Sequence, residues 1–290
     1  NSKHKILCVV TTPDKKSGRG LNYKQSPVKK LANEYNLPVL DPKDINSKHF
    51  SQKLIELNAD LFIVVAFKIL PEKILNIPKL YSINLHASLL PKYRGASPIN
   101  YAILNGDAET GLSTFIIEKK IDNGSILLQE KIKINNKINF GELSTILSKK
   151  GSLLILKTIN SIENNSIRLI KQNNKNITYA PKIIINKDCK INWDNKSINI
   201  HNQIRAFSPK PGAFTKINNK RIKLFNSEIN NNLLNINLDI GEIQYNDPYL
   251  IVGTSDGALY IKEIQLEGKN KCSVKNFILG NSNFIGEKFE

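Results

Sequence analysis

The sequence predicts an α/β fold in two parts, a mostly parallel sheet followed by a small all-β barrel. In the first half, apolar runs of strand length alternate with stretches of helical pattern, as in a sheet covered by helices. A polar, Asn-rich stretch interrupts this pattern at residues 164–177. Short alternating runs separated by Gly, Asn and Asp follow, which is typical of small β domains. We place the first domain at 1–163, the linker at 164–186 and the barrel at 187–290.

The first domain opens on a continuous apolar run at residues 6–10, the length of a buried strand. A basic loop follows from Thr12 to Gln25. Ser26 and Pro27 then have the residue types of an N-cap and a first helical position, in a helix ending near Tyr35. Further strands are expected at 61–66, 81–86, 112–117 and 126–134, and further helices after Pro98 and over 141–162. This order predicts a Rossmann-like sheet that binds ligands beyond the carboxyl ends of its strands.

The second half contains only short candidate strands. They are expected at 222–225, 234–238, 241–245, 249–252 and 258–264, with Ser255-Asp256-Gly257 as the clearest turn. Short strands separated by turn residues favour a small barrel, which we expect to be OB-like, of the oligonucleotide-binding kind.

The chain is strongly basic. Its 42 Lys and Arg residues against 25 Asp and Glu give a formal net charge of +17. Clustered cations favour a polyanionic partner such as a nucleic acid. The same excess also fits a compositional bias, because Lys, Asn and Ile are abundant throughout. Charge alone therefore leaves both interpretations open.

The cysteines, histidines and apolar segments argue against several classes of protein. Three scattered cysteines form no paired motif, which fits a reducing cytoplasm. The four histidines have no metal-ligand spacing, so no metal is expected. No apolar run is long enough to span a membrane, and nothing resembles a signal peptide. Nothing demands more than a monomer.

The candidate chemistry lies at the end of the strand expected at 81–86. Alternation along a strand places Asn84 and His86 on the same side. Together they could bind the oxyanion that forms when an amine attacks a carbonyl carbon. Asp122, in a turn further along the chain, would favour an imidazolium at His86 and help to remove the proton of the amine. Each residue also has an interpretation without a catalytic role. The histidine could simply have its hydrogen bonds satisfied within the fold, the asparagine could bond the backbone of its turn, and the aspartate could belong to an ordinary hairpin.

Several spaced motifs resemble those of the folate-dependent formyltransferases. They are Asn84-Leu85-His86-Ala87-Ser88-Leu89-Leu90-Pro91, Tyr93-Arg94-Gly95-Ala96-Ser97-Pro98-Ile99, Thr110-Gly111 and Ile121-Asp122-Asn123-Gly124. The resemblance implies catalytic roles for Asn84, His86 and Asp122. It also implies 10-formyltetrahydrofolate as the formyl donor, contacted by Ser88, Leu89, Leu90 and Pro91 and by a pterin-pocket segment, residues 65–71, that contains Phe67, Ile69 and Leu70.

The surroundings of this core resemble those members of the family that act on methionyl initiator tRNA. The loop containing Lys15, Lys16 and Arg19 is similar to their acceptor-stem loop, and on a flexible loop these cations could follow a phosphate backbone. Residues 204–214, with Arg205, are similar to their barrel domain, which is implied to bind tRNA. The resemblance thus implies formyl transfer to the amino group of methionyl initiator tRNA. Two rivals remain, a formyltransferase for a small amine and a non-catalytic RNA-binding protein.

The chain departs from the family at some positions. The family begins with a further strand and a Gly-Thr-Pro turn that this sequence lacks ahead of residue 6. Loss of a strand would leave backbone groups unpaired and a core face uncovered, which suggests an incomplete chain, a misassigned start or a gene drifting towards loss. Asn192 stands where Asp is usual, and Lys210 and Phe214 replace tryptophans.

Overall fold

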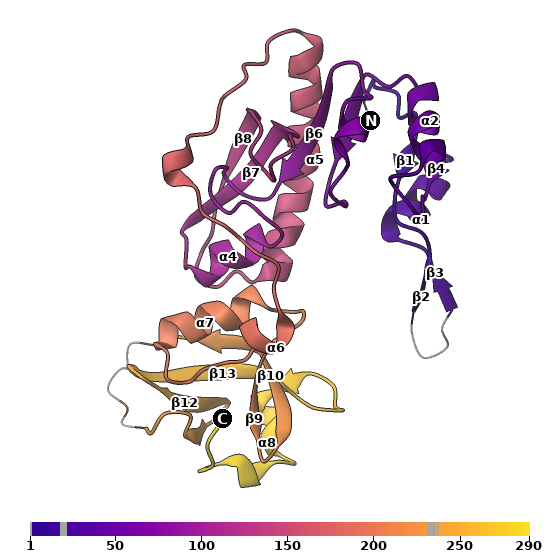
Figure 1. Ribbon diagram of the computed structural model, residues 1–290. Helices are drawn as coiled ribbons and strands as arrows, with labels where there is room; N and C mark the ends of the chain where they lie inside the picture. The colour runs from indigo at the N-terminus through magenta and orange to yellow at the C-terminus, as the bar shows by residue number, and fades with distance from the viewer. Residues whose placement is uncertain (1, 18–21, 231–235, 237) are drawn as a thin grey trace. The chain divides into compact units, whose positions relative to one another are not determined.

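The computed structural model describes the chain except for residues 1, 18–21, 231–235 and 237 (Figure 1). It divides into two compact units, which we describe separately. The first, the α/β unit, comprises residues 1–86, 113–129 and 153–172. The second, the C-terminal unit, comprises residues 87–112, 130–152 and 173–290.

The beginning of the α/β unit forms a small parallel pair of strands with two helices. Strands β1 (Val9–Val10) and β4 (Val39–Leu40) pair in parallel. Helix α1 (Pro27–Glu34) begins as predicted, because the Ser26 side chain accepts a hydrogen bond from the Lys29 N–H. Helix α2 (Lys48–Glu56) is capped in the same way by Ser47.

Part of the basic loop forms a hairpin. Strands β2 (Lys15–Ser17) and β3 (Asn22–Lys24) pair antiparallel. Lys29 anchors the base of the hairpin, since its ammonium bonds Asp14 at 2.9 Å and Asp41 at 2.7 Å. The sequence did not predict these strands, because their polar and basic residues lack the apolar pattern by which a strand is recognised.

The main sheet has the strand order β5-β6-β7-β8. Its strands are β5 (Leu61–Val64), β6 (Tyr81–His86), β7 (Glu109–Ile116) and β8 (Ile126–Lys133). Strands β5 and β6 are parallel, but β6 and β7 are antiparallel. The sheet is therefore less uniformly parallel than expected, because an apolar run predicts a buried strand and not its direction. Three helices occur along this part of the chain, α3 (Glu72–Leu75), α4 (Pro98–Leu104) and α5 (Phe140–Glu163).

Among the described residues no ladder joins the β1–β4 pair to the main sheet. Strand β5 is thus an edge, and beside it Ile63 and Val65 are 38% and 51% exposed. The apolar core of this unit includes two small clusters, one around Phe50 and Leu54 and another around Ile83.

The C-terminal unit is built on one antiparallel sheet with the order β11-β12-β13-β10-β9. The strands are β9 (Ala213–Ile217), β10 (Lys220–Glu228), β11 (Ile243–Asn246), β12 (Tyr249–Thr254) and β13 (Gly257–Leu266), with β14 (Cys272–Ser273) beside β13. Helices α6 (Ile185–Asp188), α7 (Ser197–Ala206) and α8 (Val274–Ile278) accompany them. The predicted turn joins β12 to β13. Most of the expected strand at 234–238 lies outside the described residues.

A dense core holds this sheet together. Trp193 stacks on Phe289 with ring centroids 5.4 Å apart, and its indole N–H donates to the Thr215 hydroxyl at 3.0 Å. Phe214, one of the departures from the family, is 3% exposed and lies beneath the Arg221 guanidinium at 4.0 Å. The aromatic replacement is therefore packed rather than left as a gap.

Candidate active site

Strand β6 positions two of the three predicted catalytic residues. Asn84 pairs with Phe115 and His86 with Ser113 in the ladder to β7. Because residues two apart on a strand face the same side, Asn84 and His86 share one face of the sheet. His86 is 6% exposed, and its ring meets the Phe115 ring edge to face, with centroids 6.5 Å apart.

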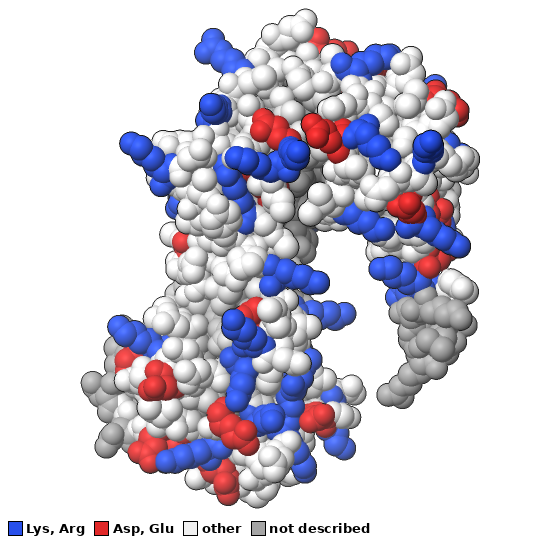
Figure 2. Space-filling model, viewed as in Figure 1, with Lys and Arg blue, Asp and Glu red and all other residues white. Residues whose placement is uncertain are grey.

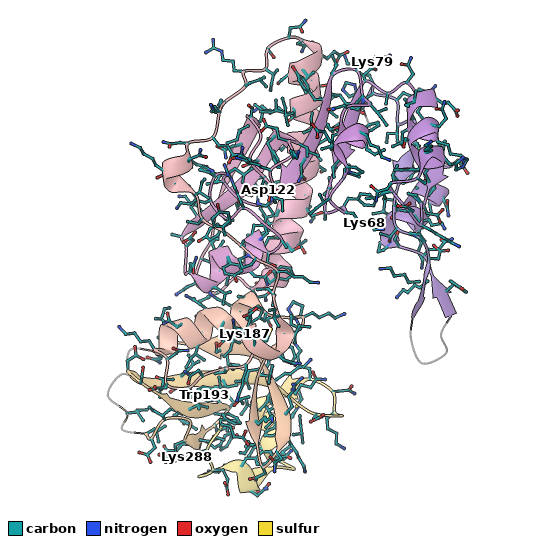
Figure 3. All side chains as sticks on the ribbon, in the orientation of Figure 1. Lys68, Lys79, Asp122, Lys187, Trp193 and Lys288 are labelled. Carbon is teal, nitrogen blue, oxygen red and sulfur yellow. The ribbon has the colours of Figure 1, made fainter. Side chains whose placement is uncertain are left out.

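Asp122 lies in the turn between β7 and β8 and is labelled in Figure 3. Its Oδ2 lies 3.7 Å from Nδ1 of His86, and the two side chains are only 11% and 7% exposed. Asp122 has a φ of +49°, a left-handed conformation that aspartate tolerates better than most residues. A carboxylate thus faces an imidazole in a buried position, as the sequence predicted.

Gly124 explains the shape of this turn. A Cβ atom at residue 124 would lie 1.7 Å from the carbonyl oxygen of Ile116. Only glycine allows the turn to fold back so closely on β7. The Asp122-Asn123-Gly124 motif therefore combines the carboxylate that faces His86 with the glycine that the turn requires.

Gln172 is a positioning residue that the sequence analysis missed. Its side-chain Nε2 donates to the carbonyl oxygens of Asp122 at 2.9 Å and Gly124 at 2.8 Å. Gln172 is 7% exposed although it lies in a polar, Asn-rich stretch. Composition predicted a solvated linker there, and no local pattern marks a glutamine that reaches back across the chain.

Asn84 carries an unusual polar atom. Its Oδ1 is buried and has no hydrogen-bond partner among the described residues. Buried polar atoms are almost always paired, and the exceptions gather where a ligand is bound or a reaction takes place. The site thus presents a carboxamide, an imidazole and a carboxylate, which together can bind a developing oxyanion and accept a proton.

The predicted pterin-pocket segment is partly exposed. Phe67 is half-buried and Ile69 is 78% exposed, whereas Leu70 packs beside Ile74 in the small cluster that includes Phe50. Ala66 has a φ of +48°, which is strained for alanine. An exposed apolar segment on a strained backbone is available to an apolar ligand.

The residues expected to contact folate on the next segment divide into two kinds. Ser88 and Leu90 are buried, and the Ser88 hydroxyl donates to the carbonyl oxygen of Lys92 at 2.6 Å. Leu89 and Pro91 line a cavity of about 730 Å³. Ser88 therefore stabilises its own turn, and the partly exposed pair retains the better access to a ligand.

The residues predicted to bind tRNA also differ in their surroundings. Lys15 is exposed on the β2–β3 hairpin, whereas Arg19 lies outside the described residues. Arg205 is 5% exposed, and its guanidinium donates to Asn202 Oδ1 and to three backbone carbonyls, those of Ile103, Asn135 and Ile138. This geometry gives Arg205 a structural task, because contact with a phosphate would break these buried bonds.

In the part of the chain that the structure describes, no group of His, Cys, Asp and Glu could hold a metal ion. No helix of that part is long and apolar enough to cross a membrane. Cys8, Cys189 and Cys272 are free thiols.

Comparison with known proteins identifies related sequences over most of the chain. A family model described as formyl transferase matches residues 1–159, and one described as formyl transferase, C-terminal domain, matches residues 183–282. The chain is 44% identical over 277 residues to the methionyl-tRNA formyltransferase of Thermodesulfovibrio yellowstonii, covering 95% of this chain and 88% of the relative. It is 40% identical over 298 residues to that of Alkaliphilus oremlandii, covering 99% and 94%.

A solved structure shares the fold. WlaRD, a sugar 3N-formyl transferase determined with dTDP and 5-N-formyl-THF, superposes with a TM-score of 0.62 at 26% identity. The match covers 83% of this chain and 82% of that protein. An α/β part followed by a C-terminal antiparallel sheet is therefore an arrangement that the chain shares with known formyltransferases.

Proposed function

The chain belongs to the formyl transferase family, and we propose how its own residues carry out formyl transfer. It is an enzyme that transfers a formyl group to methionyl-tRNA, the activity after which its relatives at 44% and 40% identity are named. The transfer is folate-dependent, as in the family. We further propose that the donor is 10-formyltetrahydrofolate and that the acceptor is the initiator form of the tRNA.

In the proposed mechanism, the methionyl amine attacks the formyl carbon while Asn84 and His86 stabilise the oxyanion that develops on the formyl oxygen. A carbon–nitrogen bond forms to the amine, and the bond from the formyl carbon to the folate nitrogen breaks. The amine proton passes towards the pair formed by His86 and Asp122 and ends on the folate nitrogen. The 3.7 Å separation of His86 Nδ1 and Asp122 Oδ2 is the observation that carries this mechanism. Orienting the amine against the formyl carbon supplies the remaining rate enhancement.

The exposed segment of residues 65–71 is the proposed wall for the pterin ring, with Phe67, Ile69 and Leu70 as its apolar contacts. Ile69 supports this assignment because it is 78% exposed. Leu89 and Pro91 are proposed to contact the folate beyond the ring. No step requires a metal ion, since the formyl group on the folate nitrogen is already an activated acyl donor.

The C-terminal unit is the proposed tRNA-binding part. Figure 2 shows Lys and Arg side chains gathered on the side where Figure 1 places β9 and β10, and lysines recur along α6, β9 and β10. We also propose that the sheet closes as a small barrel. The final residues support closure, because the Phe289 N–H bonds the Gly241 carbonyl beside β11 and the Glu290 N–H bonds the Lys216 carbonyl on β9.

Exchange of the carboxylate at Asp122 tests the mechanism. Asp122→Asn keeps the size of the side chain but removes the charge that faces His86, so kcat for formyl transfer to methionyl-tRNA should fall by about 100-fold or more. Asp60→Asn is the matched control, because Asp60 is 72% exposed at its side chain in a surface ion pair. Equal turnover in the two folded variants would contradict the role of Asp122.

A further inference from the structure

The segment from Thr178 to Ala180 is fixed to the backbone around Arg94. The Arg94 N–H donates to the Thr178 carbonyl at 2.9 Å, and the Ala180 N–H donates to the Arg94 carbonyl at 2.8 Å. The Thr178 hydroxyl also accepts a hydrogen bond from the Tyr93 N–H at 2.8 Å. Tyr179, which lies between these contacts, therefore has a backbone with a defined position in the C-terminal unit.

Gly95 permits this close approach. The Ser97 N–H donates to the Ala180 carbonyl at 3.1 Å. A Cβ atom at residue 95 would lie 2.5 Å from the same carbonyl oxygen, and Gly95 has a φ of +123°. The Arg94-Gly95 pair of the formyltransferase motif thus seats the segment that carries Tyr179.

The Tyr179 ring is exposed despite this fixed backbone. Tyr179 is 69% exposed, whereas its neighbour Ala180 is fully buried. Tyr93, on the opposing segment, shows the usual alternative, because it is 6% exposed and its hydroxyl donates to Asp107. An aromatic ring that is carried on a fixed backbone and does not join the core offers a flat apolar face to a ligand.

The charge around Tyr179 indicates what the ring meets. Residues 164–187 contain no Asp or Glu and five cations, Arg168, Lys171, Lys175, Lys182 and Lys187. Lys175 and Lys182, four residues before Tyr179 and three after it in the sequence, are exposed, as Tyr179 is. An exposed aromatic ring among cations is the combination by which proteins hold single-stranded nucleic acid, the ring stacking on a base and the cations following the backbone.

We propose that Tyr179 stacks on an unpaired base at the single-stranded end of the RNA substrate. This inference rests on the proposed function and adds a specific contact for the tRNA. Bases within a paired stem already stack on one another, so an unpaired base is the partner with a free face. Lys175 and Lys182 neutralise the phosphates beside it.

Kinetics with methionyl-tRNA test the contact. Tyr179→Ala should raise KM for the tRNA by about 5- to 150-fold, the effect of losing one stacked base, and leave kcat at saturating tRNA unchanged. Tyr179→Phe keeps the ring and should retain most of the affinity. Tyr35→Ala is the matched control, since Tyr35 is 71% exposed on the α/β unit, and it should change neither constant. An unchanged KM in Tyr179→Ala, or a loss in Tyr179→Phe equal to that in Tyr179→Ala, overturns stacking.

Direct binding of uncharged tRNA separates this inference from the proposed function. The wild-type chain should bind intact tRNA more tightly than Tyr179→Ala does, and the difference should vanish for tRNA that lacks its unpaired 3′ nucleotides. If this difference in affinity is found but the wild-type chain transfers no formyl group, the stacking contact stands and the proposed activity is refuted. Equal affinities of wild type and Tyr179→Ala for intact tRNA would refute the contact, whatever the activity.

Discussion

The α/β unit and the C-terminal unit each contain a buried histidine, and the two histidines have different partners. His86 and His201 are 6% and 7% exposed. The Nδ1 atom of His86 faces the Asp122 carboxylate at 3.7 Å. His201 instead contacts the Ser227 hydroxyl at 2.9 Å and the Asn136 carbonyl at 2.8 Å. Burial alone therefore does not distinguish the two histidines, whereas an ionisable partner on a strained turn supports the catalytic role proposed for His86.

The same contrast extends to the other polar groups. At the active site, Asn84 has a buried oxygen without a partner among the described residues, and Asp122 adopts a left-handed backbone. In the C-terminal unit, Arg205 is enclosed by a side-chain amide oxygen and three carbonyls. One region keeps polar groups available for substrates, and the other uses them to hold the chain together.

Replacing each histidine by alanine should separate a role in catalysis from a role in stability. The loss of kcat expected for His86 is the largest effect predicted here. His86→Ala should lower kcat by about 100- to 1,000-fold, since one oxyanion donor is lost. His201→Ala should leave kcat of the folded enzyme unchanged and lower the free energy of unfolding by about 1–3 kcal/mol, because the buried Ser227 hydroxyl and the Asn136 carbonyl lose their hydrogen bonds to the ring. Turnover measured well below the melting temperature, together with denaturant unfolding, distinguishes the two.

The comparison would fail in either of two ways. A large loss of kcat in folded His201→Ala would give the C-terminal histidine a part in the reaction. Nearly normal kcat in His86→Ala would remove the ring from the chemistry and leave Asp122 with no partner in the proposed mechanism.

The glycine at the active-site turn provides a smaller effect. Gly124→Ala places a methyl group against the Ile116 carbonyl, where a Cβ would lie at 1.7 Å, so the turn must shift. Such overpacking costs about 1–3 kcal/mol, and displacement of Asp122 should lower kcat as well. Gly280→Ala is the control, because nothing lies within 4 Å of its Cβ position. If Gly124→Ala keeps wild-type kcat, the position of Asp122 matters less than proposed.

Local signals in the sequence predicted much of the catalytic strand and its turn. The β6 strand was predicted at its observed bounds, residues 81–86, where apolar and polar residues alternate up to His86. Helix α1 followed from Ser26 and Pro27. Helix α7 has no such signal, since Lys196 stands at its N-cap without a side-chain cap bond. Helix α2 was not predicted, although Ser47 caps it and is a residue type typical of a helix start.

Long-range contacts explain what the sequence could not show. Gln172 bonds the carbonyls of residues 122 and 124, far away along the chain, and the buried bonds of Arg205 also link distant segments. Polar composition predicts exposure for both residues. Only the folded chain shows that the donors of both side chains are enclosed by acceptors of the protein itself.

The pH dependence of stability should give the smallest effect. Burial, followed by the nearby Arg205 charge, lowers the pKa of His201 below its usual 6.5. The unfolded chain therefore takes up this proton first as the pH falls below about 6.5, and the free energy of unfolding decreases. Above that pH the histidine is neutral in both the folded and the unfolded state, so its full contribution to the free energy of unfolding is present. His201→Gln cannot titrate, and its difference in melting temperature from the wild type should shrink on acidification. A difference that stays constant between about pH 5 and 8 would mean that His201 takes up its proton as easily in the folded chain as in the unfolded one.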